Sequence, residues 1–179
     1  MISYESNVSP FFKVNEQFCL SIENIFKSLN VECIGNCNSW GYEFTATCSF
    51  KTFTYFFKFH KSTNTRNGVI IPMDSVINEE FELKIYGLNS QHKLFIKPSK
   101  IRRWIMSKEL KSLVPYPYYY SSNQSLNSND ISKWLDFFQK RNTDVLKMKD
   151  GELLIEINRV VVEPNKLMEE VEALVKFHI

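Results

Sequence analysis

The sequence predicts an α+β fold in which successive hairpins build an antiparallel sheet and about four helices cover one face. Three observations support this prediction. Apolar and polar residues alternate over eleven positions from Trp40 to Phe50, which is typical of a strand with one buried face. Apolar positions recur at spacings of three and four over residues 12–29, which indicates an amphipathic helix. Asp150-Gly151 separates two apolar runs and is a strong hairpin signal.

The length and composition predict one domain, residues 1–179. A chain of 179 residues lies within the range of a single domain and buries a large share of its surface on folding. Its hydrophobic content of 44% and aromatic content of 15% are sufficient to fill a core. We therefore expect the fold to need no disulfide, metal ion or cofactor.

The first predicted elements are a helix at about 12–29 and a long hairpin. The apolar face of the helix is expected at Val14, Phe18, Ile22, Ile25 and Leu29. The alternating run from Trp40 is followed by a second one over 53–60, and the two meet at Lys51-Thr52. Trp40, Tyr42, Phe44, Phe57 and Leu83 are expected to point into one core.

The middle of the chain predicts more strands and a basic helix. Residues 69–71 are consistent with a short strand that Pro72 ends. Residues 81–85 and 93–97 are expected to form a second hairpin around a turn at 89–91. Pro98-Ser99 then begins a helix that runs to about Leu113.

The last third predicts a loop, two helices and a hairpin. Residues 115–128 are rich in Tyr, Ser and Asn and are expected to form a loop. Ser128 or Asn129 can cap the next helix, whose apolar face is Ile131, Trp134, Leu135 and Phe138. A hairpin of 145–148 with 153–162 precedes a final helix that begins at Pro164. Strand, turn, strand and helix thus occur twice, and either chance or a pair of ββα units explains the match.

Charge and targeting signals predict a cytoplasmic protein that does not enter a membrane. Residues 1–12 show no signal peptide, and no stretch reaches the roughly 20 apolar residues of a membrane span. The net charge is +2, but residues 51–113 hold 12 basic and 5 acidic side chains, a net +7. Without a secretion signal, we expect the four cysteines to be free thiols.

The candidate catalytic and metal-binding residues do not form a motif. Cys33 and Cys37 are a close pair, but zinc needs two further ligands with matching spacing. The remaining candidates are Cys19, Cys48, His60, His92 and His178. None of these forms a second close pair, and the sequence has no nucleophile elbow or phosphate-binding loop. We therefore predict no catalytic residue and no metal site.

Two segments are candidate binding surfaces. The first is the tyrosine-rich loop with Tyr116, Tyr118, Tyr119 and Tyr120, because tyrosine beside Ser and Asn is common in recognition surfaces. The second is the basic helix 97–113. There Lys100, Trp104, Lys108 and Lys111 have helical spacing and would share one face, on which cations could hold phosphates around a stacking ring. A solvated helix whose Trp packs under lysine stems is the alternative explanation.

These observations together predict a small non-enzymatic binding or interaction domain. The sequence does not identify its partner, for which another protein is the first candidate. The partner is expected to contact the tyrosine loop or the outer face of the sheet. One alternative is an enzyme whose site is assembled from scattered polar residues. The other is nucleic-acid binding through the basic helix. The sequence does not determine the oligomeric state.

Overall fold

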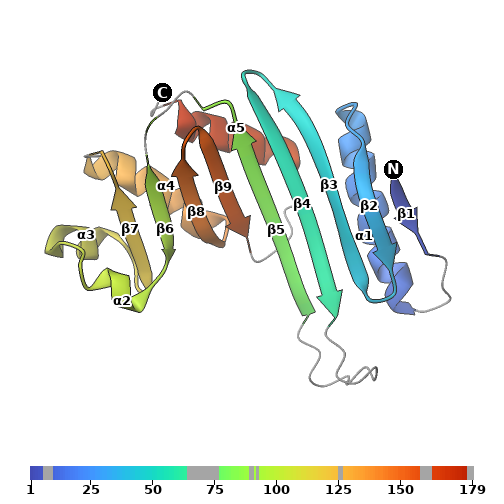
Figure 1. The fold of residues 1–179 in the computed structure, drawn as a ribbon, viewed down its shortest axis with the longest axis horizontal. Helices are drawn as coiled ribbons and strands as arrows, with labels where there is room; N and C mark the ends of the chain where they lie inside the picture. Colours follow the sequence, from blue (N-terminus) through green and yellow to red (C-terminus); the bar gives the residue numbers. More distant parts are fainter. Residues whose placement is uncertain are drawn as a thin grey trace. The chain divides into compact units, whose positions relative to one another are not determined.

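A computed structural model describes residues 1–5, 10–63, 77–88, 91, 93–124, 127–157 and 163–176 (Figure 1). Within these residues the chain forms five helices and nine strands of a mostly antiparallel sheet, which confirms the α+β class. The strand order is β1-β2-β3-β4-β5-β9-β8-β6-β7. Coverage of one face by about four helices and the pair of ββα units remain predictions.

In chain order the elements are β1 (Ile2–Tyr4), α1 (Pro10–Ser28), β2 (Cys33–Asn38), β3 (Gly41–Phe50), β4 (Phe53–Thr63), β5 (Ile77–Tyr86), β6 (Leu94–Pro98), α2 (Lys100–Arg103), α3 (Lys108–Leu113), β7 (Tyr118–Ser122), α4 (Ser128–Lys140), β8 (Thr143–Lys149), β9 (Glu152–Ile157) and α5 (Pro164–Val175).

The contacts of the chain divide it into two compact units. The first unit comprises Met1–Cys48, Phe56–Glu82 and Arg159–Pro164, and the second comprises Ser49–Tyr55, Leu83–Asn158 and Asn165–Ile179. The expectation of a single domain stays a prediction.

The first unit has an aromatic core between α1 and its strands. The rings of Phe44 and Phe59 stack with centroids 4.7 Å apart, and Phe26 of α1 meets the Phe57 ring edge-on at 5.1 Å. Strands β3 and β4 are neighbours in the sheet, which confirms the hairpin at Lys51-Thr52. The alternating pattern of these strands thus identified their buried face.

The predicted buried face of α1 is partly wrong. The buried apolar residues are Phe12, Cys19, Ile22 and Phe26, whereas Val14 is exposed. Two apolar stripes run along this helix, and spacing alone does not distinguish them. The helix also buries Asn15 and Glu23.

Both buried polar residues of α1 bond to neighbouring backbone. The Nδ2 of Asn15 donates to the carbonyl of Asn38 at 3.0 Å, and Glu23 accepts hydrogen bonds from the Ile2 amide and the Tyr4 hydroxyl.

Strands β1 and β2, which pair in parallel with each other, were not predicted from the sequence. Their residues, such as Gly35 and Asn36, lack the alternation that marks β3.

The prediction that Trp40 points into the core is wrong. Its side chain is 47% exposed, while Tyr42, Phe44, Phe57 and Leu83 are buried as predicted. The side-chain oxygen of Asn38 accepts hydrogen bonds from the amides of Trp40 and Gly41. This local turn holds Trp40 outside the strand, because β3 begins only at Gly41.

The second unit contains β6 to β9. The hairpin of β8 and β9 is confirmed, and both turn residues, Asp150 and Gly151, have positive φ, as a type I′ turn requires. The predicted hairpin of 81–85 with 93–97 is wrong, because β9 and β8 lie between β5 and β6 in the sheet. Strand β6 pairs instead with β7 and β8.

Two further predictions in the second unit need correction. The single helix from Pro98-Ser99 to Leu113 is two short helices, α2 and α3, because Ser107 caps a new helix. The loop predicted over 115–128 contains strand β7, since proline excludes a helix interior but not a strand that begins after it.

The remaining helices of the second unit agree with the sequence. Asn127, one residue before the predicted caps, accepts a hydrogen bond from the Asp130 amide and begins α4. The predicted apolar face of α4 is buried, and α5 begins at Pro164. No helix of the described ranges is long and apolar enough to cross a membrane. Several sequence features lie outside the described residues, namely residues 69–71, 89, 90, His92, 158–162 and His178.

Candidate binding surface

The segment from Ser99 to Tyr116, here called the α2–α3 corner, joins β6 to β7. Two serine caps determine its local structure. The Oγ of Ser99 accepts from the Arg102 amide, and the Oγ of Ser107 accepts from the Leu110 amide, each at 3.2 Å. Each cap satisfies an amide that the first turn of a helix leaves unpaired. Residues 104–107 therefore separate two short helices.

Arg103 ties the corner together. Its Nη1 donates to the carbonyls of Pro115 at 3.1 Å and Tyr118 at 2.8 Å, and its Nη2 donates to the carbonyl of Lys111 at 2.9 Å. The ammonium of Lys111 donates in turn to the carbonyl of Trp104 at 3.0 Å. Two cations of the corner thus hold its backbone, rather than facing solvent as free charges.

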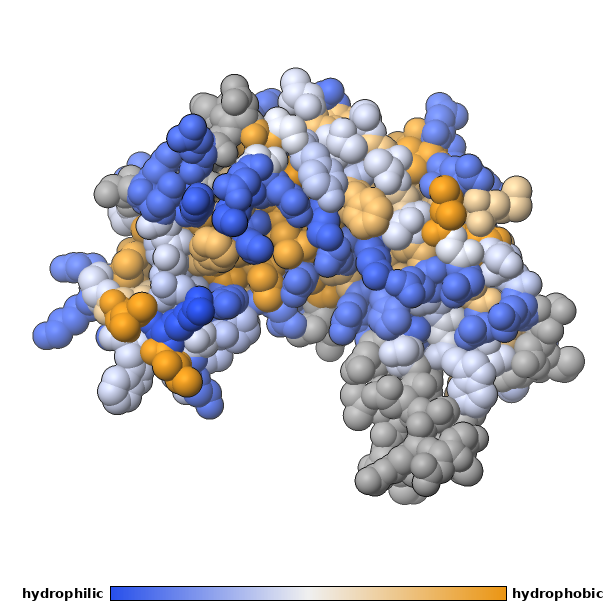
Figure 2. Space-filling model, viewed as in Figure 1, coloured by the Kyte–Doolittle hydropathy of each residue, from blue (hydrophilic) through white to orange (hydrophobic). Residues whose placement is uncertain are grey.

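Three large apolar side chains of the corner lie almost entirely in water. The exposed fractions are 86% for Ile101, 85% for Trp104 and 77% for Ile105. At the lower left of Figure 2, strongly hydrophobic side chains protrude from the region of α2. Scattered exposed apolar residues are ordinary, but three of them within five consecutive residues make a candidate interaction surface.

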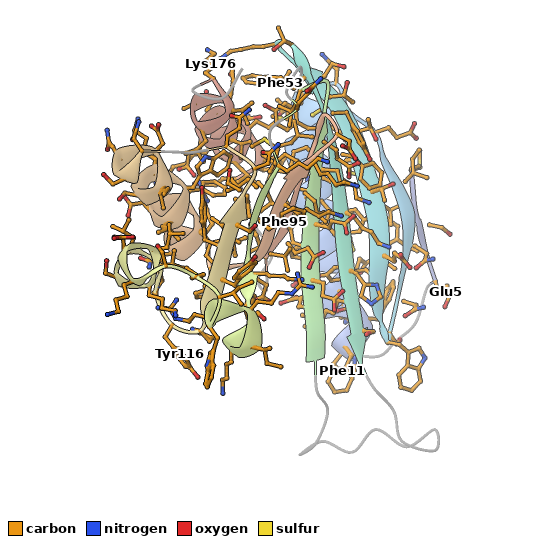
Figure 3. The ribbon with its side chains drawn as sticks, turned by 60° about the vertical axis from the view of Figure 1, so that its left-hand side comes forward. Glu5, Phe11, Phe53, Phe95, Tyr116 and Lys176 are labelled. Carbon is orange, nitrogen blue, oxygen red and sulfur yellow. The ribbon has the colours of Figure 1, made fainter. Side chains whose placement is uncertain are left out.

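Tyr116 extends this apolar surface at the end of the corner. Its ring is 66% exposed, and the Nζ of Lys100 lies 5.9 Å from its centroid. Figure 3 shows Tyr116 beside α2.

The four predicted tyrosines occupy different environments. Tyr118 meets the ring of Phe138 edge-on at 4.8 Å, Tyr119 is half-buried and Tyr120 is buried. Burial raises the pKa of Tyr120. Only Tyr116 is fully available to a partner.

The predicted basic face is divided between two helices. Lys100 lies in α2 and Trp104 follows it, whereas Lys108 and Lys111 lie in α3, so helical spacing does not place all four on one face. Ile101 and Ile105 were not predicted from the sequence as surface residues. Their spacing could have indicated this surface. Ile101 lies three residues before Trp104 and four before Ile105, so the three residues lie on the same side of a helical turn.

A groove of about 410 Å³ runs beside the corner along β7. The residues that line it are Ile105, Met106, Ser107, Leu110, Tyr119, Tyr120, Ser121, Ser122, Gln124 and Ile131. Ile105 belongs both to the apolar surface and to the groove wall, so the two features are continuous.

The cysteine thiols are buried and unreactive in character. Burial raises the pKa of Cys33 and of Cys48 to about 11, and it also raises the pKa of Cys19 and Cys37. A thiol with so high a pKa is protonated near neutral pH and is a poor nucleophile. Among the residues that the structure describes, no three His, Cys, Asp or Glu side chains are grouped so that they could hold a metal ion.

Comparisons of the chain with protein-family models, with curated proteins and with solved structures find no match. Its function is therefore inferred from its own residues.

Proposed function

We propose that the chain is a non-enzymatic binding domain that docks a protein partner through the α2–α3 corner. The observation that carries this proposal is the exposure of Ile101, Trp104 and Ile105 on a single turn. Removing one such side chain from water contributes roughly 1.5–3 kcal/mol. Tryptophan is also among the residues most enriched at the energetic centres of protein interfaces.

The rigidity of the corner supports the proposal. Arg103 donates hydrogen bonds to three carbonyls through its two terminal nitrogens, and Lys111 donates one to the carbonyl of Trp104. A surface that is already ordered in the free protein loses less conformational entropy on binding. The apolar side chains are therefore presented on a fixed backbone.

Charge determines the kind of partner. Residues 97–113 carry six basic side chains and one acidic one, a net +5. Lys100, Arg102 and Lys108 surround the apolar side chains in sequence, and all three are exposed. The fitting partner has an apolar pocket with an acidic rim, because complementary charges steer the encounter and exclude wrong partners.

Nucleic-acid binding is the second candidate, favoured by the exposed ring of Trp104 among cations. The flanking Ile101 and Ile105 offer no flat face on which a base could stack. Arg103 and Lys111 are already bonded to carbonyls of the corner. A protein partner uses every part of this surface, which is why we favour it.

The test is affinity capture by the immobilised full-length chain from an extract of its source cells, with and without nuclease. Trp104→Ala and Ile105→Ser should each reduce recovery of the partner at least about tenfold, a change of ~1.4 kcal/mol. The matched control is Ile34→Ser, because Ile34 is also an exposed isoleucine but lies on β2.

Three results would contradict the proposal. Recovery that is equal with Trp104→Ala removes the corner as the contact. An equal loss with Ile34→Ser shows that exposed isoleucines act without specificity. Recovery that nuclease abolishes, and that falls steeply with salt, establishes the nucleic-acid alternative.

A further inference from the structure

Strand β7 is the last strand of the sheet, and one of its edges faces the groove. The Asn123 amide donates to the Lys93 carbonyl at 3.1 Å, and the Ser99 amide donates to the Pro117 carbonyl at 3.0 Å. In an antiparallel pair, residues bonded to the partner strand alternate with residues whose backbone points away. The odd-numbered residues of β7 therefore bond to β6, and the even-numbered residues direct their backbone groups to the free edge.

The corner covers only part of this edge. Arg103 occupies the carbonyl of Tyr118, and the Tyr120 amide donates to the Met106 Sδ at 3.5 Å. A thioether sulfur is a weak acceptor, so this second bond is easily exchanged for a carbonyl. The carbonyl of Tyr120 points the same way, toward the groove.

The groove has the lining that a peptide segment requires. Met106, Leu110 and Ile131 supply apolar walls, and Ser107 and Gln124 supply polar groups. Among the described residues that line the groove, none is charged. Exposed Lys108 follows the lining residue Ser107, and exposed Glu109 precedes the lining residue Leu110, within a segment, 97–113, whose net charge is +5.

We infer that this groove takes an extended segment of the protein partner, which adds to the edge of β7 as a further strand. The segment would accept from the Tyr120 amide in place of Met106, donate to the Tyr120 carbonyl, and insert an apolar side chain beside Leu110. Acidic residues of the segment would face Lys108 and Arg102. Main-chain bonds give affinity in this mode, and pockets for alternate side chains give specificity. The inference rests on the proposed function, because the groove continues the corner through Ile105.

The first experiment selects short peptides from a random display library on the immobilised full-length chain and measures their affinity by fluorescence anisotropy. Selected peptides should combine an apolar residue with Asp or Glu. Leu110→Asp should weaken their binding at least about tenfold. Leu113→Asp is the matched control, because Leu113 lies on the same helix but does not line the groove.

The second experiment requires no change in the protein. Each backbone nitrogen of a selected peptide is methylated in turn, and strand addition predicts a loss of at least about tenfold only at alternate positions. Binding that resists every methylation, or that falls at helical spacing, overturns the inference. Selection of no peptide, or selection of peptides indifferent to Leu110→Asp, overturns it as well.

Failure of this inference and failure of the proposed function give different results. If partner capture depends on Trp104 while no peptide shows the alternating pattern, the corner binds and the groove does not. If selected peptides show the pattern while capture is indifferent to Trp104, the groove binds and the corner is not the contact.

Discussion

Arg102 and Arg103 are adjacent and chemically identical, but the structure gives them different roles. Arg102 is exposed, whereas the guanidinium of Arg103 is half-buried and bonds to three carbonyls. A guanidinium presents several donors in a fixed plane, which suits this arrangement. The sequence shows two basic residues, and only the fold determines which one faces a partner.

The difference predicts unequal effects on stability. Arg103→Met should lower the free energy of unfolding by about 2 kcal/mol, because it leaves carbonyls without a charged donor. Arg102→Met should change it by less than about 0.5 kcal/mol, as exposed substitutions usually do. Urea denaturation measures both, and equal losses would show that Arg103 does not hold the corner.

A second pair of residues tests the aromatic core. Phe44 is buried and stacks on Phe59, whereas the side chain of Trp40 is about half exposed to solvent. Phe44→Ala should cost about 3–5 kcal/mol of unfolding free energy. Trp40→Ala should cost less than about 1 kcal/mol, although it deletes a larger side chain. A loss below about 1 kcal/mol for Phe44→Ala would contradict its burial in the core.

At the scale of elements, the β8–β9 hairpin depends on its two-residue turn. Asp150 and Gly151 have φ of 53° and 81°. A Cβ at residue 151 would lie 2.9 Å from the Leu88 carbonyl oxygen. A side chain at residue 151 is therefore unfavourable for two reasons. The positive φ is strained for any residue other than glycine, and the Cβ would collide with the Leu88 carbonyl oxygen.

Gly151→Ala is accordingly expected to destabilise the fold by more than about 1 kcal/mol in thermal or urea unfolding. Asp150→Asn is the control at the same turn, because asparagine readily adopts positive φ and asparagine-glycine is a favoured pair. If Gly151→Ala has no effect, the turn tolerates a different conformation from the one described.

Local patterns predicted the elements whose signals are local. Strict alternation identified β3 and β4, and Asp150-Gly151 identified the β8–β9 turn. Strand order is not a local property, and for this reason β5 and β6 were wrongly joined in one hairpin. Strands β5 and β9, which are neighbours in this sheet, are far apart in the sequence.

The candidate surface shows a similar limit. The α2–α3 corner lies within the stretch 97–120 that holds both segments singled out from the sequence. The apolar character of this surface was not predicted. The prediction was based on the spacing of the lysines and did not include Ile101 and Ile105. The break between α2 and α3 depends on the Ser107 cap and on Arg103, whose partners lie as far as 15 residues along the chain. Such contacts leave no periodic trace.

At the scale of the whole molecule, positive and negative charges serve different purposes. Residues 51–113 hold the excess of positive charge, which includes the corner. Two glutamates of α5, Glu170 and Glu172, instead pair with basic side chains of the fold. Glu170 pairs with Lys140 and Arg141, and the buried Glu172 pairs with Lys51 and Lys176. Binding and stability should therefore respond differently to pH.

The pH dependence of folding should be governed in part by Glu172. Its Oε2 accepts from the ammonium of Lys51, and its Oε1 lies 3.1 Å from the Nζ of Lys176. The hydrogen bond from Lys51, followed by that from Lys176, holds the pKa of this carboxyl below its usual 4.5 in spite of some desolvation. In the unfolded chain these partners are lost and the pKa returns to its ordinary value. A carboxyl with a depressed folded-state pKa stabilises the fold fully above the unfolded pKa.

This stabilisation is lost as the pH falls below about 4.5 through the folded-state pKa. Glu172→Gln should lower the free energy of unfolding at neutral pH and flatten its decline on the acid side, so that variant and parent converge at low pH. Glu169→Gln is the control, because Glu169 is an exposed glutamate on the same helix. Urea denaturation at a series of pH values measures all three chains. A Glu172→Gln curve parallel to that of the parent at every pH would show that the two lysines do not stabilise the ionised form.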